Sequence, residues 1–522
     1  MLQINNLTVT MKKDLRTIFS DFSFTMSDTD KAVIIGEEGN GKSTLLKLIY
    51  DPALAEPYCE YSGEIITRGA RLGYLAQEMS EDEKSQSAEG YFSAVSGFYD
   101  ITPKELSRFC RELGLPAQTP YSEQIIETLS GGERVKLQLL RLMIEDPDLL
   151  LLDEPSNDID IGALEFLERF INTCGKPVLF VSHDETLIEN TANVIIHIEQ
   201  VRRKTLARAT IARAPYREYA QTRLRSLGKQ ERDASKEKEE FDKKAERFRK
   251  IAQKVEHRQN IVSRQDPHGG QLLKKKMHAV KAQEKRLDKE RDSLTQPPDT
   301  ESAIFLKFPE NTRVPNGKTV LNFRLDELSA QGLPLARDIE LTVTGAEKLC
   351  IIGRNGAGKT TLLRMIARQL LARGDIRAGY MPQNYFELLP MDALPPDFLA
   401  PSGLKDDLTR AKTLLGSVKY TPQEMEHKIS ALSGGQKAKL MFLKMILDGC
   451  NVLILDEPTR NFSPQSNPVI REILREYGGA IICVSHDRRF ISEVCGKIYE
   501  LTAQGLRPAD ISGQTDAGAA DK

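Results

Sequence analysis

The chain has 522 residues, of which 40% are hydrophobic and 28% are charged, and its formal net charge is −2. This length is too great for a single core and predicts two to four domains, and the composition is that of a soluble globular protein. Because no apolar stretch approaches the roughly 18 to 20 residues of a membrane-spanning helix and the N-terminus lacks a signal-peptide pattern, we expect no membrane segment and a cytoplasmic protein.

Cysteine usage gives no indication of a structural framework. The seven cysteines are odd in number, are scattered along the chain and include no C-x-x-C pair. They therefore indicate neither a disulfide framework nor a zinc site. We expect most of them to be buried thiols.

Two glycine-rich loops are the first strong motifs in chain order. GEEGNGKST follows the apolar run AVII, GRNGAGKTT follows LCII, and both match G-x-x-x-x-G-K-[ST] at an expected strand-to-helix transition. Such a loop points backbone N–H groups at phosphate oxygens, so we expect a nucleoside triphosphate. The predicted binding residues are Gly36, Gly39, Asn40, Gly41, Lys42, Ser43 and Thr44 in the first loop and Gly353, Asn355, Gly356, Gly358, Lys359, Thr360 and Thr361 in the second.

Three further motifs occur in both halves at equal spacing. LSGGE or LSGGQ is followed by a leucine-rich run ending in DEP and then by VSHD. From Ser130 to Asp153 and from Ser433 to Asp456 the distance is 23 residues in each case, and each aspartate precedes a VSHD histidine by 30 residues. The chain is therefore an internal duplication. The halves differ mainly before a YLAQ or YMPQ glutamine, which follows the first glycine of its loop by 41 residues in one half and 30 in the other.

These repeated residues predict hydrolysis of a nucleoside triphosphate. We expect the loop lysines to reach the β- and γ-phosphates, and the VSHD histidines to contact the γ-phosphate. Each glutamate after the aspartate would face the attacking water. A lone histidine or Asp-Glu pair is more often structural, but its repetition favours the catalytic interpretation. The predicted metal ligands are Ser43, Gln77, Asp153, Thr360, Gln383 and Asp456, for Mg²⁺, and the predicted catalytic residues are Glu154, Glu457, His183, His486, Gln77 and Gln383.

The order of phosphate loop, glutamine, LSGG, DEP and SHD resembles the ATP-binding cassette, over roughly residues 1–205 and 300–510. The resemblance implies an α/β fold with two tandem cassettes of the P-loop NTPase type, and ATP as the nucleotide. It also implies that the LSGG residues of one half close over the ATP of the other, so that a monomer could form an intramolecular sandwich. Those residues are Ser130, Gly131 and Gly132 for the second site and Ser433, Gly434 and Gly435 for the first.

The segment between the halves is strongly basic and has a helical pattern. Between Arg213 and Asp292 there are 24 Lys and Arg residues against 14 Asp and Glu residues, a net charge of +10. Apolar residues recur every seven positions from Phe241 to Val262 and again from Leu273 to Leu294, on either side of SRQDPHGG. Since proline and paired glycines interrupt a helix, we expect an antiparallel helical hairpin, with arms from Lys229 to Val262 and from Gln271 to Leu294.

Basic charge is concentrated around the expected turn of that hairpin. A lysine run is usually only a solvated surface, but like charges gathered at one end of a hairpin favour a polyanionic partner. No aromatic platform flanks these residues, so phosphate and shape recognition of folded RNA is the expected mode. The predicted RNA-binding residues are Arg258, Arg264, Lys274, Lys275, Lys276 and Lys281, with Asp266 as the one acid among them.

Two cassettes joined by a charged helical hairpin, without a transmembrane part, resemble the ABC-F translation factors. This resemblance implies a ribosomal partner, with the hairpin in the E site near large-subunit rRNA and the P-site tRNA. One subgroup protects ribosomes from large-subunit antibiotics, and another relieves stalled ribosomes. A tandem ATPase that docks on a separate permease is the remaining alternative.

Two departures favour the antibiotic-protection subgroup. TRNFSP at residues 459–464 follows the second DEP, so Ser463 stands where the first half has Asp160, and the two ATP sites should be unequal. The stretch from Asp51 to Ala70 is also too short for the extra arm of many housekeeping members. The expected domains are residues 1–212 for the first cassette, 213–299 for the hairpin with its basic tip near 258–281, 300–510 for the second cassette and 511–522 for a disordered tail.

Overall fold

The computed structural model describes residues 2–157, 159–201, 206–261, 277–283, 285–287, 289, 308–309, 312–330 and 332–509. The chain forms two compact units. One contains both α/β halves, Met1–Tyr216 and Glu301–Lys522, and the other is Arg217–Thr300. None of the helices in the described ranges combines the length and the apolar character that a membrane-spanning segment requires.

Each half is built around a six-stranded sheet in which five strands are parallel and the last strand is antiparallel. In spatial order, the first sheet contains β5 (Leu72–Leu75), β6 (Leu149–Asp153), β7 (Val178–Val181), β3 (Lys31–Ile35), β8 (Val194–Val201) and β9 (Leu206–Ala212). The second contains β13 (Ala378–Met381), β14 (Val452–Asp456), β15 (Ala480–Val484), β12 (Lys348–Ile352), β16 (Lys497–Thr502) and β17 (Gly505–Pro508). The identical order confirms the predicted duplication and the α/β class.

Smaller antiparallel sheets accompany the two large ones. The first half has β2 (Thr17–Met26), β1 (Leu2–Met11) and β4 (Cys59–Ile66), and the second has β10 (Thr319–Ala330) and β11 (Leu333–Thr344). The helices of the first half are α1 (Lys42–Tyr50), α2 (Glu81–Lys84), α3 (Ala88–Ser93), α4 (Pro103–Glu112), α5 (Gly131–Glu145), α6 (Ile161–Thr173) and α7 (Glu185–Thr191). Those of the second are α10 (Lys359–Leu371), α11 (Pro395–Leu399), α12 (Lys405–Ser417), α13 (Pro422–Glu426), α14 (Gly434–Leu447), α15 (Asn467–Glu476) and α16 (Arg488–Val494).

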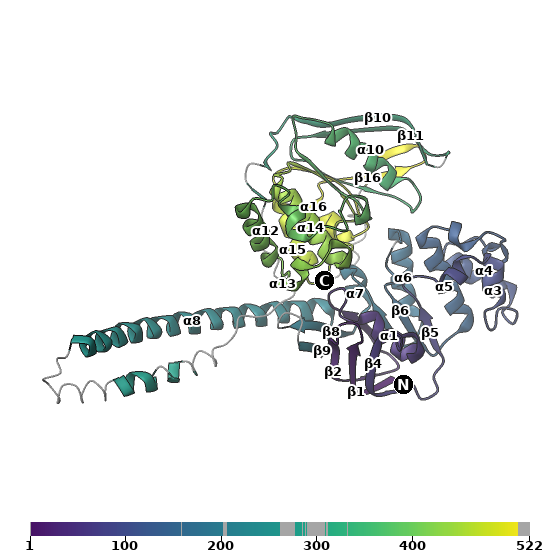
Figure 1. Cartoon of the computed structure of the whole chain (residues 1–522). Helices are drawn as coiled ribbons and strands as arrows, with labels where there is room; N and C mark the ends of the chain where they lie inside the picture. Colours follow the sequence, from purple (N-terminus) through teal and green to yellow (C-terminus); the bar gives the residue numbers. More distant parts are fainter. Residues whose placement is uncertain are drawn as a thin grey trace, which may run out of the picture. The chain divides into compact units, whose positions relative to one another are not determined.

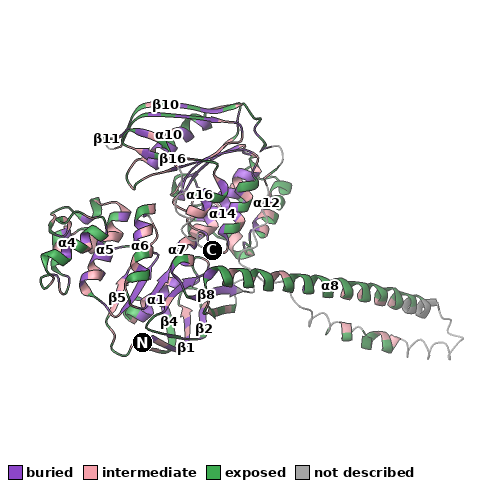
Figure 2. Ribbon diagram, turned by 180° about the vertical axis from the view of Figure 1, so that it is seen from behind, coloured by how far each residue is buried: buried purple, intermediate pink, exposed green. Residues whose placement is uncertain are grey.

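The central strands explain the continuous apolar runs of the sequence. Every residue of β6 and of β14 is buried, because a parallel strand inside a sheet has helices on both of its faces. Figure 2 shows the same contrast across the molecule, with buried residues on the sheet strands and exposed residues along most of α8. The predicted strand before each phosphate loop is β3 or β12, and the predicted helix after it is α1 or α10.

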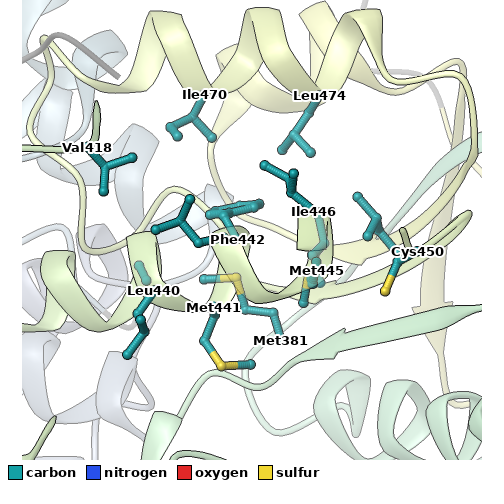
Figure 3. Close-up of a cluster of buried hydrophobic side chains, with 14 of the residues drawn as sticks. Met381, Val418, Leu440, Met441, Phe442, Met445, Ile446, Cys450, Ile470 and Leu474 are labelled. Carbon is teal, nitrogen blue, oxygen red and sulfur yellow. The ribbon is translucent and has the colours of Figure 1, made fainter. Parts of the chain in front are cut away.

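The second half has a large helical core beside its sheet. Figure 3 shows Phe442 and Ile446 on the side of α14 that faces Ile470 and Leu474 of α15, whereas Leu440 points away from α15. All five side chains are buried, and they belong to one hydrophobic cluster of this half. Burial of α14 in this cluster supports the helix, whose first residues belong to the second LSGG motif.

The linking unit contains one long helix, α8 (Tyr216–Ile261), of 46 residues. At ~1.5 Å per residue it extends about 69 Å, and Figure 1 shows it as a continuous helix. The helix begins at Tyr216, directly after Pro215, rather than at Lys229 as the sequence pattern indicated. Residues 277–283 and 285–287 are helical as well, but the expected turn at SRQDPHGG and the tail at residues 511–522 lie outside the described residues.

Truncating the core of the second half should destabilise it far more than truncating its surface. Leu440 is fully buried, whereas Leu404 is 64% exposed. We expect Leu440→Ala to lower the free energy of unfolding of this half by ~2–5 kcal/mol and Leu404→Ala to lower it by less than about 0.5 kcal/mol. Urea unfolding followed by circular dichroism measures both, and equal effects of the two changes would contradict the described packing.

Candidate functional site

Each phosphate loop connects a central strand to the helix that follows it, and its glycines are required by close contacts. Gly41 has a φ of 85° directly before α1, and a Cβ atom there would lie 2.5 Å from Cδ1 of Ile18. At Gly36 a Cβ atom would lie 2.3 Å from the carbonyl oxygen of Ile198. Only glycine, which has no Cβ atom, allows the backbone to come this close to these neighbours. The two glycines therefore fix the backbone conformation of the loop.

Both loop lysines are held inside their own loops. Nζ of Lys42 donates to the carbonyl oxygen of Gly36 at 2.9 Å, and Nζ of Lys359 donates to that of Gly353 at 2.8 Å. Both side chains are buried. Burial lowers the pKa of Lys359, while the nearby Glu457 opposes that effect. A confined ammonium group among backbone N–H groups is suited to an anionic ligand.

The strand-end aspartates meet the hydroxyl residues of the loops. Oγ of Ser43 donates to Oδ1 of Asp153 at 2.9 Å, and the hydroxyl of Tyr74 donates to Oδ2 at 3.3 Å. Burial raises the pKa of Asp153 to about 6 and also that of Asp456 to about 6, and the Thr360 hydroxyl lies beside Asp456. A hydroxyl and a carboxylate side by side offer the oxygen ligands that Mg²⁺ prefers.

The glutamates that follow have an unusual backbone conformation. Glu154 has a φ of 50° and Glu457 a φ of 52°, a region that L-residues rarely adopt. Their backbone N–H groups donate to the carbonyl oxygens of Val181 at 3.1 Å and Val484 at 2.9 Å, which holds them in place. Strained residues of this kind cluster at functional sites. Both predicted catalytic glutamates therefore occupy equivalent, tightly constrained positions.

The electrostatics of the two glutamates differ. Although burial alone would raise the pKa of Glu154, His183 lowers it, with Nε2 at 3.0 Å from Oε1 of Glu154. In the second half the corresponding atoms of His486 and Glu457 are 3.8 Å apart. There burial and Asp456 raise the pKa of Glu457 to about 8, and burial with Lys359 lowers that of His486 to about 4.

Several polar atoms of these groups lack protein partners. Oε2 of Glu154 and Oε1 of Glu457 are buried without a hydrogen-bond partner among the described residues. Such atoms are costly unless water, an ion or a ligand satisfies them. Together with the paired hydroxyls and aspartates, they fit a magnesium–nucleotide complex. Ser43 with Asp153, and Thr360 with Asp456, are the groups that would hold the metal.

The second phosphate loop faces residues of the first half across a cavity of about 1030 Å³. The predicted site residues that line it come from both halves. They are Ser130, Gly131 and His183 from the first half and Asn355, Gly356, Gly358, Lys359, Thr360, Thr361, Gln383, Gly434, Asp456, Glu457 and His486 from the second.

The first phosphate loop makes direct contact with the second LSGG motif. The backbone N–H of Gly435 donates to Oε2 of Glu38 at 2.9 Å, and Nζ of Lys439 lies 3.5 Å from Oε1 of Glu37. Ser433 caps α14 by accepting from the N–H of Gln436. Gln77, by contrast, is exposed. The structure therefore brings together most of the predicted first site but leaves this glutamine at its surface.

A carboxylate near the second site comes from the first half. Asp160 acts electrostatically on Lys359 and on His486, raising the pKa of each against the larger effect of burial. The corresponding Ser463 is neutral, and its hydroxyl donates to Oγ of Ser466 at 3.1 Å. In TRNFSP, Ser463 stands at the position that Asp160 occupies in the first half. The second half therefore lacks the negative charge that the first half has there.

Some residues of the site were not found by sequence reasoning. Glu37 and Glu38 occupy variable positions of the loop motif, so the pattern carried no signal for them. Phe386, 66% exposed, lies under Nζ of Lys437 at 5.2 Å from its ring centroid. Ala330 and Leu335 supply apolar lining to the cavity. No aromatic motif had indicated where a nucleotide base would pack.

The predicted RNA-binding residues are only partly described. Arg264, Lys274, Lys275 and Lys276 lie outside the described residues. Arg258 belongs to α8, and Lys281 is exposed on the helical residues 277–283. Their role in binding RNA stays a prediction.

Comparisons with known proteins agree with this architecture. The family model of the ABC transporter matches residues 19–157 and 336–460, about half of the chain. ABC transporter F family member 5 of Arabidopsis thaliana is 25% identical over 93% of this chain and 73% of its own length. Ribosome protection protein VmlR of Bacillus subtilis (strain 168) is 28% identical over 94% and 85%, and ATP-binding protein Uup of Escherichia coli (strain K12) is 27% identical over 94% and 79%.

Among solved structures, the fold is similar to that in a complex of the archaeal ribosomal stalk protein aP1 and the archaeal ribosome recycling factor aABCE1. The TM-score is 0.57 at 15% identity, and the match covers 97% of this chain and 90% of that chain. At this identity the likeness shows the fold alone. With both phosphate loops inside the matched segments, the chain belongs to the ABC transporter family, as an ATPase with two tandem cassettes.

Proposed function

We propose that this chain is an ATP-dependent ribosome-binding factor of the ABC-F type. The observation that carries the proposal is a match over almost the whole chain to a ribosome protection protein, at 28% identity. The linking segment supports it, because α8 and the residues after it carry the excess of positive charge that folded RNA requires. The permease alternative gives that basic segment no role.

In this proposal each ATP site draws on both halves of the chain. Lys42 and Lys359 bind phosphate oxygens, and Mg²⁺, when bound, would neutralise part of the phosphate charge. Glu154 and Glu457 orient water and accept its proton. The LSGG residues of the opposite half contact the terminal phosphate, so that closing of the halves depends on ATP and opening follows hydrolysis.

Within that function we propose protection of ribosomes from large-subunit antibiotics as the specific role. TRNFSP and the short stretch from Asp51 to Ala70 support it, as does the name of the VmlR relative. The helical linker would reach from the E site toward the peptidyl-transferase centre and the P-site tRNA. Relief of stalled ribosomes is the second candidate, since F-family relatives such as the Arabidopsis protein match over a similar share of the chain.

Blocking hydrolysis should trap the protein on ribosomes. The double variant Glu154→Gln, Glu457→Gln keeps the size of both side chains but removes their ability to take a proton from water. We expect it to co-sediment with bacterial ribosomes in ATP, whereas the same variant in ADP and the unaltered chain in ATP should dissociate. If the variant fails to co-sediment at low salt, the ribosomal function is wrong.

Neutralising the basic tip should weaken ribosome binding without affecting nucleotide binding. For Lys274→Ala, Lys275→Ala, Lys276→Ala we expect a smaller dependence of ribosome affinity on salt, with the logarithmic slope reduced by roughly 2 to 3 because three phosphate contacts are lost. The matched control is Lys236→Ala, Lys238→Ala, Lys243→Ala, in the mixed-charge part of α8. Equal losses in the two triple variants would argue against a specific tip.

The specific role is tested in a susceptible bacterium. Expression of the chain should raise the minimum inhibitory concentration of at least one drug among lincosamides, pleuromutilins and streptogramins A, because these act near the peptidyl-transferase centre. Tetracycline, which acts on the small subunit, should be unaffected. No change for any drug would remove the protective role and leave the general translation factor.

A further inference from the structure

Three cysteines that are distant in the sequence come together inside the second cassette. Cys350 lies on β12, Cys483 lies on the neighbouring strand β15, and Cys495 ends α16. Their sulfur atoms all lie within 4.8 Å of one another, and those of Cys483 and Cys495 are 3.7 Å apart. The topology of the sheet produces this cluster, because Cys350 and Cys483 are direct partners in the parallel register.

The first cassette provides an internal comparison, because it has the same fold without these thiols. The register partners that correspond to Cys350 and Cys483 are Val33 and Phe180, and the residue that ends α7 is Ala192. All three are buried. The fold therefore requires only apolar side chains of various sizes at these positions, and packing alone does not explain three sulfur atoms at one place.

The separations match a site in which three sulfurs surround one ion. With metal–sulfur distances of about 2.3 Å, the sulfurs of a trigonal site lie about 4 Å apart, so small side-chain movements suffice here. Among the described residues the group includes no histidine or carboxylate as a fourth ligand. Structural zinc sites are almost always four-coordinate, whereas soft thiolate ligands select ions such as Cu(I).

The three thiols also differ in how readily they lose a proton. Hydrogen bonds from the Cys350 and Cys483 thiols lower the pKa of Cys495 against the effect of burial, and Lys348 adds to this. Burial raises the pKa of Cys350 and of Cys483. Cys495, which is less buried than the other two, therefore supplies the first thiolate, and an ion that it holds displaces the protons of the other two.

We propose that Cys350, Cys483 and Cys495 form a three-thiolate binding site for a soft, thiophilic metal ion, with Cu(I) as its representative. Binding is a ligand exchange without a redox step: Cu(I) stays Cu(I), and the thiol protons leave to solvent. Cys350 precedes Gly353 of the second phosphate loop by three residues, and Cys483 precedes His486 by three residues. A bound ion would therefore join the two strands that carry these parts of the ATP site.

The test is a titration of the full chain with Cu(I) under anaerobic, reducing conditions, in competition with the chelator bicinchoninate. The unaltered chain should withhold one equivalent of Cu(I) from the chelator. Cys350→Val and Cys495→Ala, which introduce the residues of the first cassette, should each lower the affinity by at least about 100-fold. The matched control is Cys174→Ala, a partly exposed thiol of the first cassette that lies outside the cluster.

Two outcomes would overturn the site. One is unchanged Cu(I) affinity in both cluster variants, and the other is an equal loss in Cys174→Ala. A second measurement does not depend on how the variants fold: copper X-ray absorption of the unaltered chain should give three sulfur neighbours at about 2.3 Å. Nitrogen or oxygen neighbours, or only two sulfurs, would contradict the proposal.

Discussion

The geometry of a parallel sheet is the constraint on which both ATP sites depend. Parallel strands all end at the same edge, so whatever follows them in the sequence is gathered there. In the first half β3 leads into the phosphate loop, β6 ends at Asp153 and β7 leads into His183. The hydrogen bond from Ser43 to Asp153 joins residues 110 positions apart, and it exists because their strands belong to one sheet. The second half repeats the arrangement with β12, β14 and β15.

This constraint explains how much could be predicted from the sequence. Equal spacing of repeated motifs identifies strand ends and helix starts, and a shared sheet edge then brings Lys359, Asp456 and Glu457 to one cavity. The fold class, the duplication and most of the neighbours at each site follow from this pattern. No knowledge of side-chain contacts was needed, because the backbone topology alone brings these residues to one edge of the sheet.

What the sequence could not predict depends on register and on contacts between distant segments. The cysteine cluster forms only because β12 and β15 are neighbours in a particular register, and no local spacing expresses that. The start of α8 at Tyr216 was missed because the heptad pattern marks where a helix has a partner, not where it begins. Glu38 was missed because the loop motif tolerates any residue at its position.

Charge makes the two sites unequal beyond what the motifs suggest. The first loop carries Glu37 and Glu38 where the second carries Arg354 and Asn355. Conversely, a carboxylate of the first half acts on the second site, whereas its counterpart Ser463 is neutral. The pKa of Glu457, raised to about 8, is a further difference, since Glu154 is stabilised as an anion by His183. A duplicated fold has thus diverged in electrostatics while keeping the strand order of its six-stranded sheet.

The contact between Glu38 and Gly435 has a consequence for how the first site receives its nucleotide. A backbone N–H donates one strong hydrogen bond, and at Gly435 the Glu38 carboxylate already accepts it. If a terminal phosphate took this N–H, as the proposed function requires, it would displace the carboxylate. In the proposed ATP site, the Glu38 carboxylate and a phosphate would then be alternative acceptors for one N–H at the start of α14, so that occupation of the first site would be an exchange of anions.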